Sequence, residues 1–130
     1  MLAVDTNVLV RHIARDDAAQ TARSDRLFDS QRILLLKTVL LETEWVLRYR
    51  YGYDRQATVT AFRALAGLPA IQIEDAAIVA QALDSFAAGM DFADALHLAS
   101  STGAAQFATF DRGLATSARR LKTIDVLLIS

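Results

Sequence analysis

Short apolar runs alternate along the whole chain with longer stretches in which apolar residues recur at helical spacing. The apolar runs predict five short β-strands, over residues 2–4, 33–36, 70–73, 107–110 and 126–129. The amphipathic stretches predict seven helices, over residues 16–30, 38–51, 54–66, 75–88, 91–103 and 111–120, with a short one over 8–14. Aspartates or Thr38 precede most of these helices as caps, and glycines such as Gly52 follow several of them.

The order of these elements predicts an α/β fold. No Asn-Gly or Asp-Gly pair is present to make a tight hairpin. Strands that alternate with helices form right-handed crossovers, so we expect a mostly parallel sheet with helices on both faces. A chain of 130 residues is the usual size of one compact domain, and we expect residues 1–130 to form a single one.

Composition excludes several classes of protein. The chain has no cysteine, which removes disulfide scaffolds, thiolate zinc sites and cysteine nucleophiles. At 53% hydrophobic residues it is not disordered, and its net charge of −1 argues against a strongly basic nucleic-acid-binding tail. Apolar runs are too short for a membrane span, and Asp5 and Asn7 interrupt any signal peptide. We therefore expect a soluble protein of the cytoplasm.

The charged residues are biased toward arginine and aspartate. Lys37 and Lys122 are the only lysines, and the other basic residues are arginines, whose flat guanidinium suits phosphate. The acids are mostly aspartates, which serve as helix caps, turn residues or metal ligands.

Four acids stand where chemistry would be expected. Asp5 and Asp111 directly follow predicted strands, and ligands collect at the carboxyl ends of parallel strands. Glu42 and Asp94 lie on predicted helices beside apolar positions, where a carboxylate needs a hydrogen bond, an opposite charge or a cation. For Glu42 the neighbours at helical spacing are Trp45, Val46 and Tyr49, so we expect it to border the buried face, with Glu44 pointing elsewhere.

A purely structural interpretation explains each acid singly. Asp5, Asp91 and Asp111 precede predicted helices, where an aspartate accepts backbone hydrogen bonds without any further role. Asp91 and Asp94 have capping-box spacing. Glu42 would need only to lie in the first turn of its helix to be favoured by the helix dipole.

Four segments together resemble the motifs of PIN-domain ribonucleases, in the family's order. They are Val4-Asp5-Thr6-Asn7-Val8-Leu9-Val10, then Leu41-Glu42-Thr43-Glu44-Trp45-Val46-Leu47-Arg48, then Asp91-Phe92-Ala93-Asp94-Ala95-Leu96-His97-Leu98-Ala99, and last Ala108-Thr109-Phe110-Asp111. The resemblance covers essentially the whole chain, at the size of the VapC-type toxins of bacterial toxin–antitoxin pairs. The fourth segment departs from the commoner pattern, because Arg112-Gly113-Leu114 follows where the family often has a second aspartate and a phenylalanine.

The resemblance implies a fold, an activity and a site. The fold is a three-layer α/β/α sandwich around a mostly parallel five-stranded sheet. The activity is a metal-dependent endoribonuclease toxin, with RNA as substrate, a separate VapB-type antitoxin and a homodimeric state. Asp5, Glu42, Asp94 and Asp111 match the catalytic acids. Asp5 and Asp94 are the first choices as metal ligands, with Glu42, Asp111 and Asp91 as further candidates. Thr6, Asn7, Thr109 and Arg112 are candidates for positioning the substrate.

Clustered carboxylates have a physical reason of their own to bind a cation. They repel one another in a partly buried site, and a divalent cation relieves that repulsion. Oxygen ligands without cysteine or paired histidines suit Mg²⁺ or Mn²⁺ better than Zn²⁺. His97 stands beside leucines, and we interpret it as a packing residue.

An RNA substrate also needs positive charge and base contacts. Six arginines near the motif ends are candidates for a basic rim: Arg11, Arg15, Arg48, Arg50, Arg55 and Arg112. Five aromatic residues lie in or after the predicted helix over 38–51, and we expect most of them to be core or dimer contacts rather than base-stacking residues: Trp45, Tyr49, Tyr51, Tyr53 and Phe62.

Two other functions stay open. A catalytically silent PIN-like module would bind RNA or a protein without cutting. A receiver-like phosphoacceptor domain is also a small α/β protein, but it needs an acid pair after the first strand and an aspartate after the middle one. Here Asp5 stands alone and Lys37 follows the run over 33–36.

Overall fold

The structure, a computed structural model, describes all residues from 1 to 130. All seven predicted helices and all five predicted strands are present. The chain divides into two compact units, Met1–Ala76 and Ala77–Ser130, and each is described by itself. None of the helices combines the length and the apolar character needed to cross a membrane.

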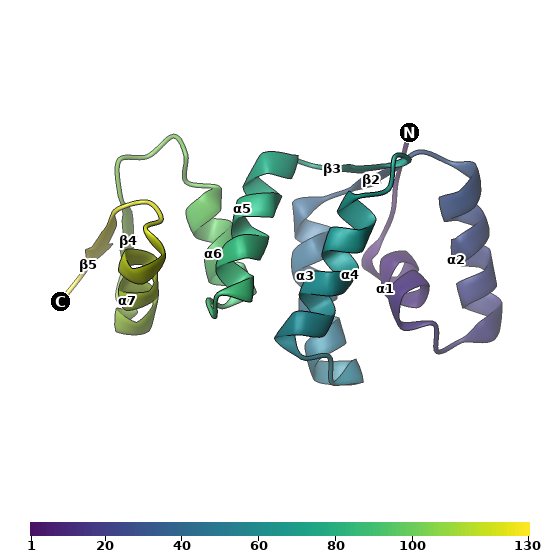
Figure 1. Cartoon of the computed structure of the whole chain (residues 1–130), viewed down its shortest axis with the longest axis horizontal. Helices are drawn as coiled ribbons and strands as arrows, with labels where there is room; N and C mark the ends of the chain where they lie inside the picture. Colours follow the sequence, from purple (N-terminus) through teal and green to yellow (C-terminus); the bar gives the residue numbers. More distant parts are fainter. The chain divides into compact units, whose positions relative to one another are not determined.

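The first unit contains three strands and four helices (Figure 1). In chain order they are β1 (Leu2–Ala3), α1 (Thr6–Ala14), α2 (Ala18–Ser30), β2 (Ile33–Leu35), α3 (Lys37–Tyr51), α4 (Arg55–Ala66) and β3 (Ile71–Ile73). The strands form a parallel sheet in the order β1-β2-β3, with Leu2 opposite Ile33 and Ile33 opposite Ile71. Helix α1 contacts both α2 and α3 and lies between them (Figure 1).

The second unit continues the same alternation. Its elements are α5 (Ala76–Ala87), α6 (Phe92–Ala99), β4 (Phe107–Thr109), α7 (Arg112–Leu121) and β5 (Val126–Leu128). Strands β4 and β5 pair in parallel, with Phe107 opposite Val126. The rings of Phe86 and Phe92 meet edge to face at 5.3 Å between centroids and are buried. The predicted α/β class is thus confirmed: the five strands pair as a three-stranded and a two-stranded sheet, and every pair is parallel.

Burial explains why β2 is continuously apolar. It is the central strand of its sheet, and Ile33 and Leu35 are completely buried. A strand with partners on both edges and helices on its faces has no solvated side, so the alternation of apolar and polar residues disappears. Leu9 of α1, Leu47 of α3 and Phe62 of α4 are also buried and belong to the same apolar core.

Several predicted helix boundaries are shifted. Helix α1 begins at Thr6 rather than at residue 8. Helix α3 begins at Lys37, and Thr38 is not its cap; the cap position is Leu36, whose apolar side chain makes no capping hydrogen bond. The backbone N–H of Lys37 instead donates to the Glu74 carboxylate at 2.9 Å, a partner supplied by the segment after β3. Helix α6 ends at Ala99 rather than 103, in a turn where Ser101 donates its hydroxyl to the carbonyl of His97.

One polar group in the core of the first unit has no partner. The hydroxyl of Thr43 on α3 is fully buried and makes no hydrogen bond. Thr6, also buried, donates its hydroxyl to the carboxylate of Glu42. Of these two buried threonines, only Thr6 has a hydrogen-bond partner for its hydroxyl.

We expect Thr43→Val to stabilise the protein by about 1 kcal/mol, because valine has nearly the same shape and removes an unsatisfied buried hydroxyl. Thr6→Val is the matched comparison and should cost about 1–2 kcal/mol, since it leaves a carboxylate without its donor. Urea unfolding of both variants against the parent measures the two changes. A loss of stability in Thr43→Val would show that its hydroxyl is bonded.

Candidate functional site

The first and second sequence motifs meet in the first unit. Asp5 follows β1 and accepts a hydrogen bond from the backbone N–H of Thr6 at 2.7 Å, which caps α1. Thr6 is buried, and its hydroxyl donates to the Oε1 atom of Glu42, 36 residues further along the chain. Thr6 thereby fixes the carboxylate of one candidate acid next to the segment that carries another.

The surroundings of Glu42 differ from those expected. Glu42 is exposed, and its helical neighbours Trp45 and Tyr49 are 53% and 63% exposed. The buried carboxylate of α3 is Glu44, which is 2% exposed and paired with Arg48 at 3.0 Å. The prediction that Glu42 borders the buried face is wrong, because α3 turns Thr43, Glu44 and Leu47 inward. Nor is Glu42 in the first turn of its helix, so the dipole interpretation also fails.

In the second unit, the carboxyl group of Asp94 lies within electrostatic reach of Asp91 and Asp111. Asp91 caps α6 and accepts from the backbone N–H of Asp94 at 3.2 Å, which is the predicted capping contact. Asp111 caps α7 and accepts from the backbone N–H of Leu114 at 3.1 Å. Burial raises the pKa of Asp94, and the negative charges of Asp91 and Asp111 raise it further.

His97 is exposed, so it is not the packing residue that the sequence predicted. It acts on Asp94 in the opposite direction from the acids, because its charge lowers the pKa of that carboxyl. The effect is the smallest of the four, and the mutual repulsion of the three acids is not cancelled.

The other candidate residues lie next to these acids. Thr109 accepts the backbone N–H of Asp111 at 3.0 Å through its hydroxyl oxygen and so orders the turn after β4. Arg112, the first residue of α7, is exposed. Asn7 is exposed in the first turn of α1 and lines a pocket between α1 and α2 with a volume of about 260 Å³.

The capping interpretation is confirmed for Asp5, Asp91 and Asp111. Capping does not exclude chemistry, because each carboxylate has a second oxygen. Within neither unit do three or more acidic or histidine side chains converge closely enough to hold a metal ion. The donors available are all carboxylate and hydroxyl oxygens, the type that Mg²⁺ and Mn²⁺ prefer.

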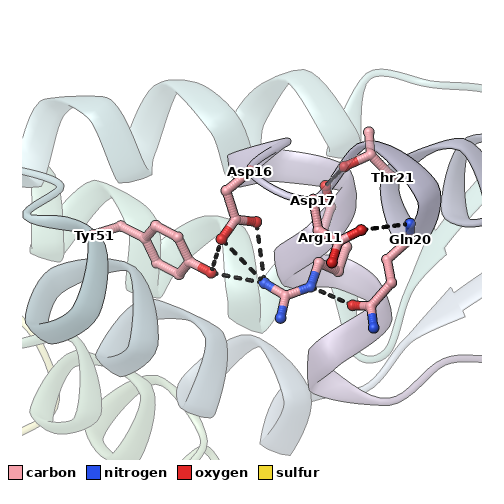
Figure 2. A network of polar contacts seen from close by, with 6 residues as sticks. All are labelled: Arg11, Asp16, Asp17, Gln20, Thr21 and Tyr51. Carbon is pink, nitrogen blue, oxygen red and sulfur yellow. Dashed lines mark hydrogen bonds and ion pairs between the residues drawn. The ribbon is translucent and has the colours of Figure 1, made fainter.

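Several arginines of the predicted basic rim are already paired. Arg11 forms an ion pair with Asp16 at 3.0 Å and Arg15 one with Asp25 at 2.7 Å, while Arg48 pairs with Glu44 as described above. Figure 2 shows how Arg11 also reaches Tyr51 and Gln20, which ties α1 to α3 and α2. Of the five aromatic residues, Phe62 is a core residue as predicted, whereas Trp45 and Tyr49 lie outside the core.

Sequence reasoning missed the residues of α2 that face Asn7 across the pocket. They are Gln20, Arg23 and Ser24. Their spacing of three and four residues places them on one helical face, and this signal was available from the sequence. These three residues lie outside the four acidic motifs, so motif order does not point to them.

Comparison with known proteins identifies a family and a similar solved structure. A family model described as the PIN domain matches residues 2–129. A crystal structure of Mycobacterium tuberculosis VapC20, described as a toxin that cleaves the sarcin-ricin loop, is similar at 23% identity and a TM-score of 0.45, over 90% of this chain and 95% of that one. No curated protein matches the chain significantly.

We expect Asp94→Asn to raise the thermal midpoint at neutral pH, by a few degrees at most because the side chain is partly solvated. A carboxyl whose folded pKa is raised stabilises the fold below its unfolded pKa and loses that contribution as pH rises through the folded pKa. The gain from asparagine should therefore shrink in acid. Thermal unfolding followed by circular dichroism at neutral and at acidic pH tests this, with Asp29→Asn, at an exposed position, as the control. An equal shift in both variants would contradict the proposed repulsion.

Proposed function

The chain belongs to the PIN-domain family, whose members are nucleases, and from this premise we propose that it is a metal-dependent endoribonuclease and the toxin of a VapC-type toxin–antitoxin pair. One observation carries the proposal: the family match extends over residues 2–129 and therefore includes all four acidic motifs in their order. The contact of Thr6 with Glu42 supports it, because it joins the first two motifs.

We assign the catalytic role to Asp5, Glu42, Asp94 and Asp111. Asp5 and Asp94 are the preferred metal ligands, with Glu42, Asp111 and Asp91 as further candidates. The assignment of these acids to one reaction rests on the order of the motifs along the chain. Burial is the main cause of the raised pKa of Asp94, and the negative charges of Asp91 and Asp111 add to it; this added repulsion supports the assignment, because a cation would relieve it.

The chain's own residues would hold the reacting groups. Mg²⁺ or Mn²⁺, when bound, supplies the Lewis acidity that activates a water molecule and neutralises charge on the phosphodiester. Thr6 orients the Glu42 carboxylate by its hydrogen bond, and Thr109 orders the turn that presents Asp111. Asn7 and Arg112 are exposed beside these acids, where they would position the RNA.

The same proposal includes the partners that the resemblance implies: RNA as substrate, a VapB-type antitoxin that inhibits the enzyme, and a homodimer acting in the cytoplasm. A receiver-like domain is not supported by the family match, and the central strand β2 is followed by Lys37 and not by an aspartate. A catalytically silent PIN-like module is the remaining alternative, and it would be favoured if calorimetry detected no binding of Mn²⁺ to the protein.

We expect Asp111→Asn to reduce RNA cleavage at least 100-fold without unfolding the protein. Asparagine caps a helix as well as aspartate does, so α7 keeps its start while the charge is lost. Asp54→Asn is the matched control, because Asp54 caps α4 in the same way, with the backbone N–H of Ala57 at 2.8 Å, and lies outside the motifs. Cleavage of a labelled RNA in Mg²⁺ or Mn²⁺ measures both variants.

Asp5→Asn and Asp94→Asn should likewise abolish cleavage, together with any growth arrest on expression, and chelation with EDTA should abolish it in the parent protein. Full activity in either variant, or in EDTA, would refute the metal-dependent assignment.

A further inference from the structure

The pocket between α1 and α2 is a site outside the acidic motifs. It has a volume of about 260 Å³ and lies wholly within the first unit. Six residues line it: Asn7, Val8, Arg11, Gln20, Arg23 and Ser24. We propose that this pocket binds one nucleotide of the substrate RNA, with the phosphate on Arg23; this inference rests on the proposed function and names a substrate-positioning residue for it.

Charge favours an anion in the pocket. No acidic residue lines it. Arg11 is bound to Asp16 and to the hydroxyl of Tyr51, so its charge is compensated (Figure 2). Arg23 is exposed and forms no ion pair with any carboxylate. One uncompensated guanidinium therefore faces the pocket, and guanidinium binds phosphate through paired hydrogen bonds.

Polar groups around Arg23 are available to a ligand. Ser24 lines the pocket, and its hydroxyl can donate to a bound phosphate or sugar oxygen. The carbonyl oxygen of Gln20 accepts from Arg11 Nε at 2.5 Å, which leaves its amide group free to donate (Figure 2). Asn7 adds a second amide without a partner.

Position links the pocket to the proposed chemistry. Asn7 belongs to the first turn of α1, and Asp5 is the cap of the same helix. An RNA strand held by Arg23 and Asn7 would lie alongside the start of α1 and hence beside the Asp5 carboxylate. Binding there would restrict how the strand enters the site, which lowers the entropic cost of aligning a phosphodiester for attack.

Size argues against a folded protein element as the occupant. The pocket is smaller than the 300–1,000 Å³ typical of sites for drug-sized ligands, and a helix is about 10–12 Å wide with its side chains. A single nucleotide unit suits the volume and the mixture of a cation with amide and hydroxyl groups. An extended acidic peptide is the competing occupant, and the experiment below distinguishes it.

The test measures RNA binding separately from cleavage. Fluorescence anisotropy of a short labelled single-stranded RNA, in EDTA to prevent cutting, is compared for Arg23→Gln and Arg26→Gln. Arg26 lies three residues further along α2, is exposed, and does not line the pocket, so both variants lose the same charge from the same helix. Arg23→Gln should weaken binding by roughly fivefold to tenfold and reduce the salt slope by about 0.7, while Arg26→Gln changes neither.

Cleavage kinetics in Mg²⁺ provide a second readout. Arg23→Gln should raise KM by a similar factor and leave kcat nearly unchanged, because the residue binds substrate remote from the reacting atoms. Inorganic phosphate should compete with RNA for the parent protein more strongly than for Arg23→Gln, whereas a phosphate effect without any RNA effect would identify a free-phosphate site and overturn the proposal.

Four further outcomes overturn the pocket proposal. Equal losses of RNA affinity in Arg23→Gln and Arg26→Gln would show that the effect comes from removing any positive charge and not from the pocket. Unchanged RNA binding in Arg23→Gln with impaired binding of an acidic peptide would assign the pocket to a protein partner. A parent protein that binds no RNA would refute both proposals. A parent that binds RNA through Arg23 but does not cut it would refute only the proposed nuclease activity, and one that cuts RNA without help from Arg23 would refute only the pocket.

Discussion

Strand β2 has a parallel partner on each side, and this pairing determines where the polar segments of the first unit lie. The carboxyl ends of parallel strands share one edge of a sheet, so the segments after β1, β2 and β3 emerge together. Asp5 follows the first strand, Lys37 begins the helix after the second, and Glu74 follows the third. The hydrogen bond between Thr6 and Glu42 and the contact of Glu74 with Lys37 both depend on this arrangement.

Features that depend on neighbouring residues were predictable from the sequence. The aspartate caps of α2, α4, α6 and α7 are local, since each carboxylate bonds a backbone N–H three residues later. Gly52 has a φ of 67°, as the end of α3 requires. The start of α3 could not be predicted, because its partner Glu74 is 37 residues away.

The candidate site was predictable as a set of residues and not as an arrangement. Motif order indicated Asp5 and Glu42, but the donor that joins their segments, Thr6, was only a positioning candidate. The apolar spacing on α3 predicts the wrong buried carboxylate, because Glu44 takes that position. Its ion pair with Arg48 lets a carboxylate lie in apolar surroundings. Arg23 could not be singled out from the sequence, because it is distinguished by having no ion-pair partner, and the sequence does not show which charges pair.

The contacts around Lys37 have a consequence for the order of folding. Its backbone donates to Glu74, and its ammonium group pairs with Asp75 at 2.7 Å, so the first turn of α3 is completed by residues that follow α4 and β3. The rest of α3 needs no such distant help to form its backbone bonds. Closing this long loop costs chain entropy before the contacts compensate for it. The beginning of α3 should therefore acquire its native structure after its middle, at a late stage when β3 joins the sheet.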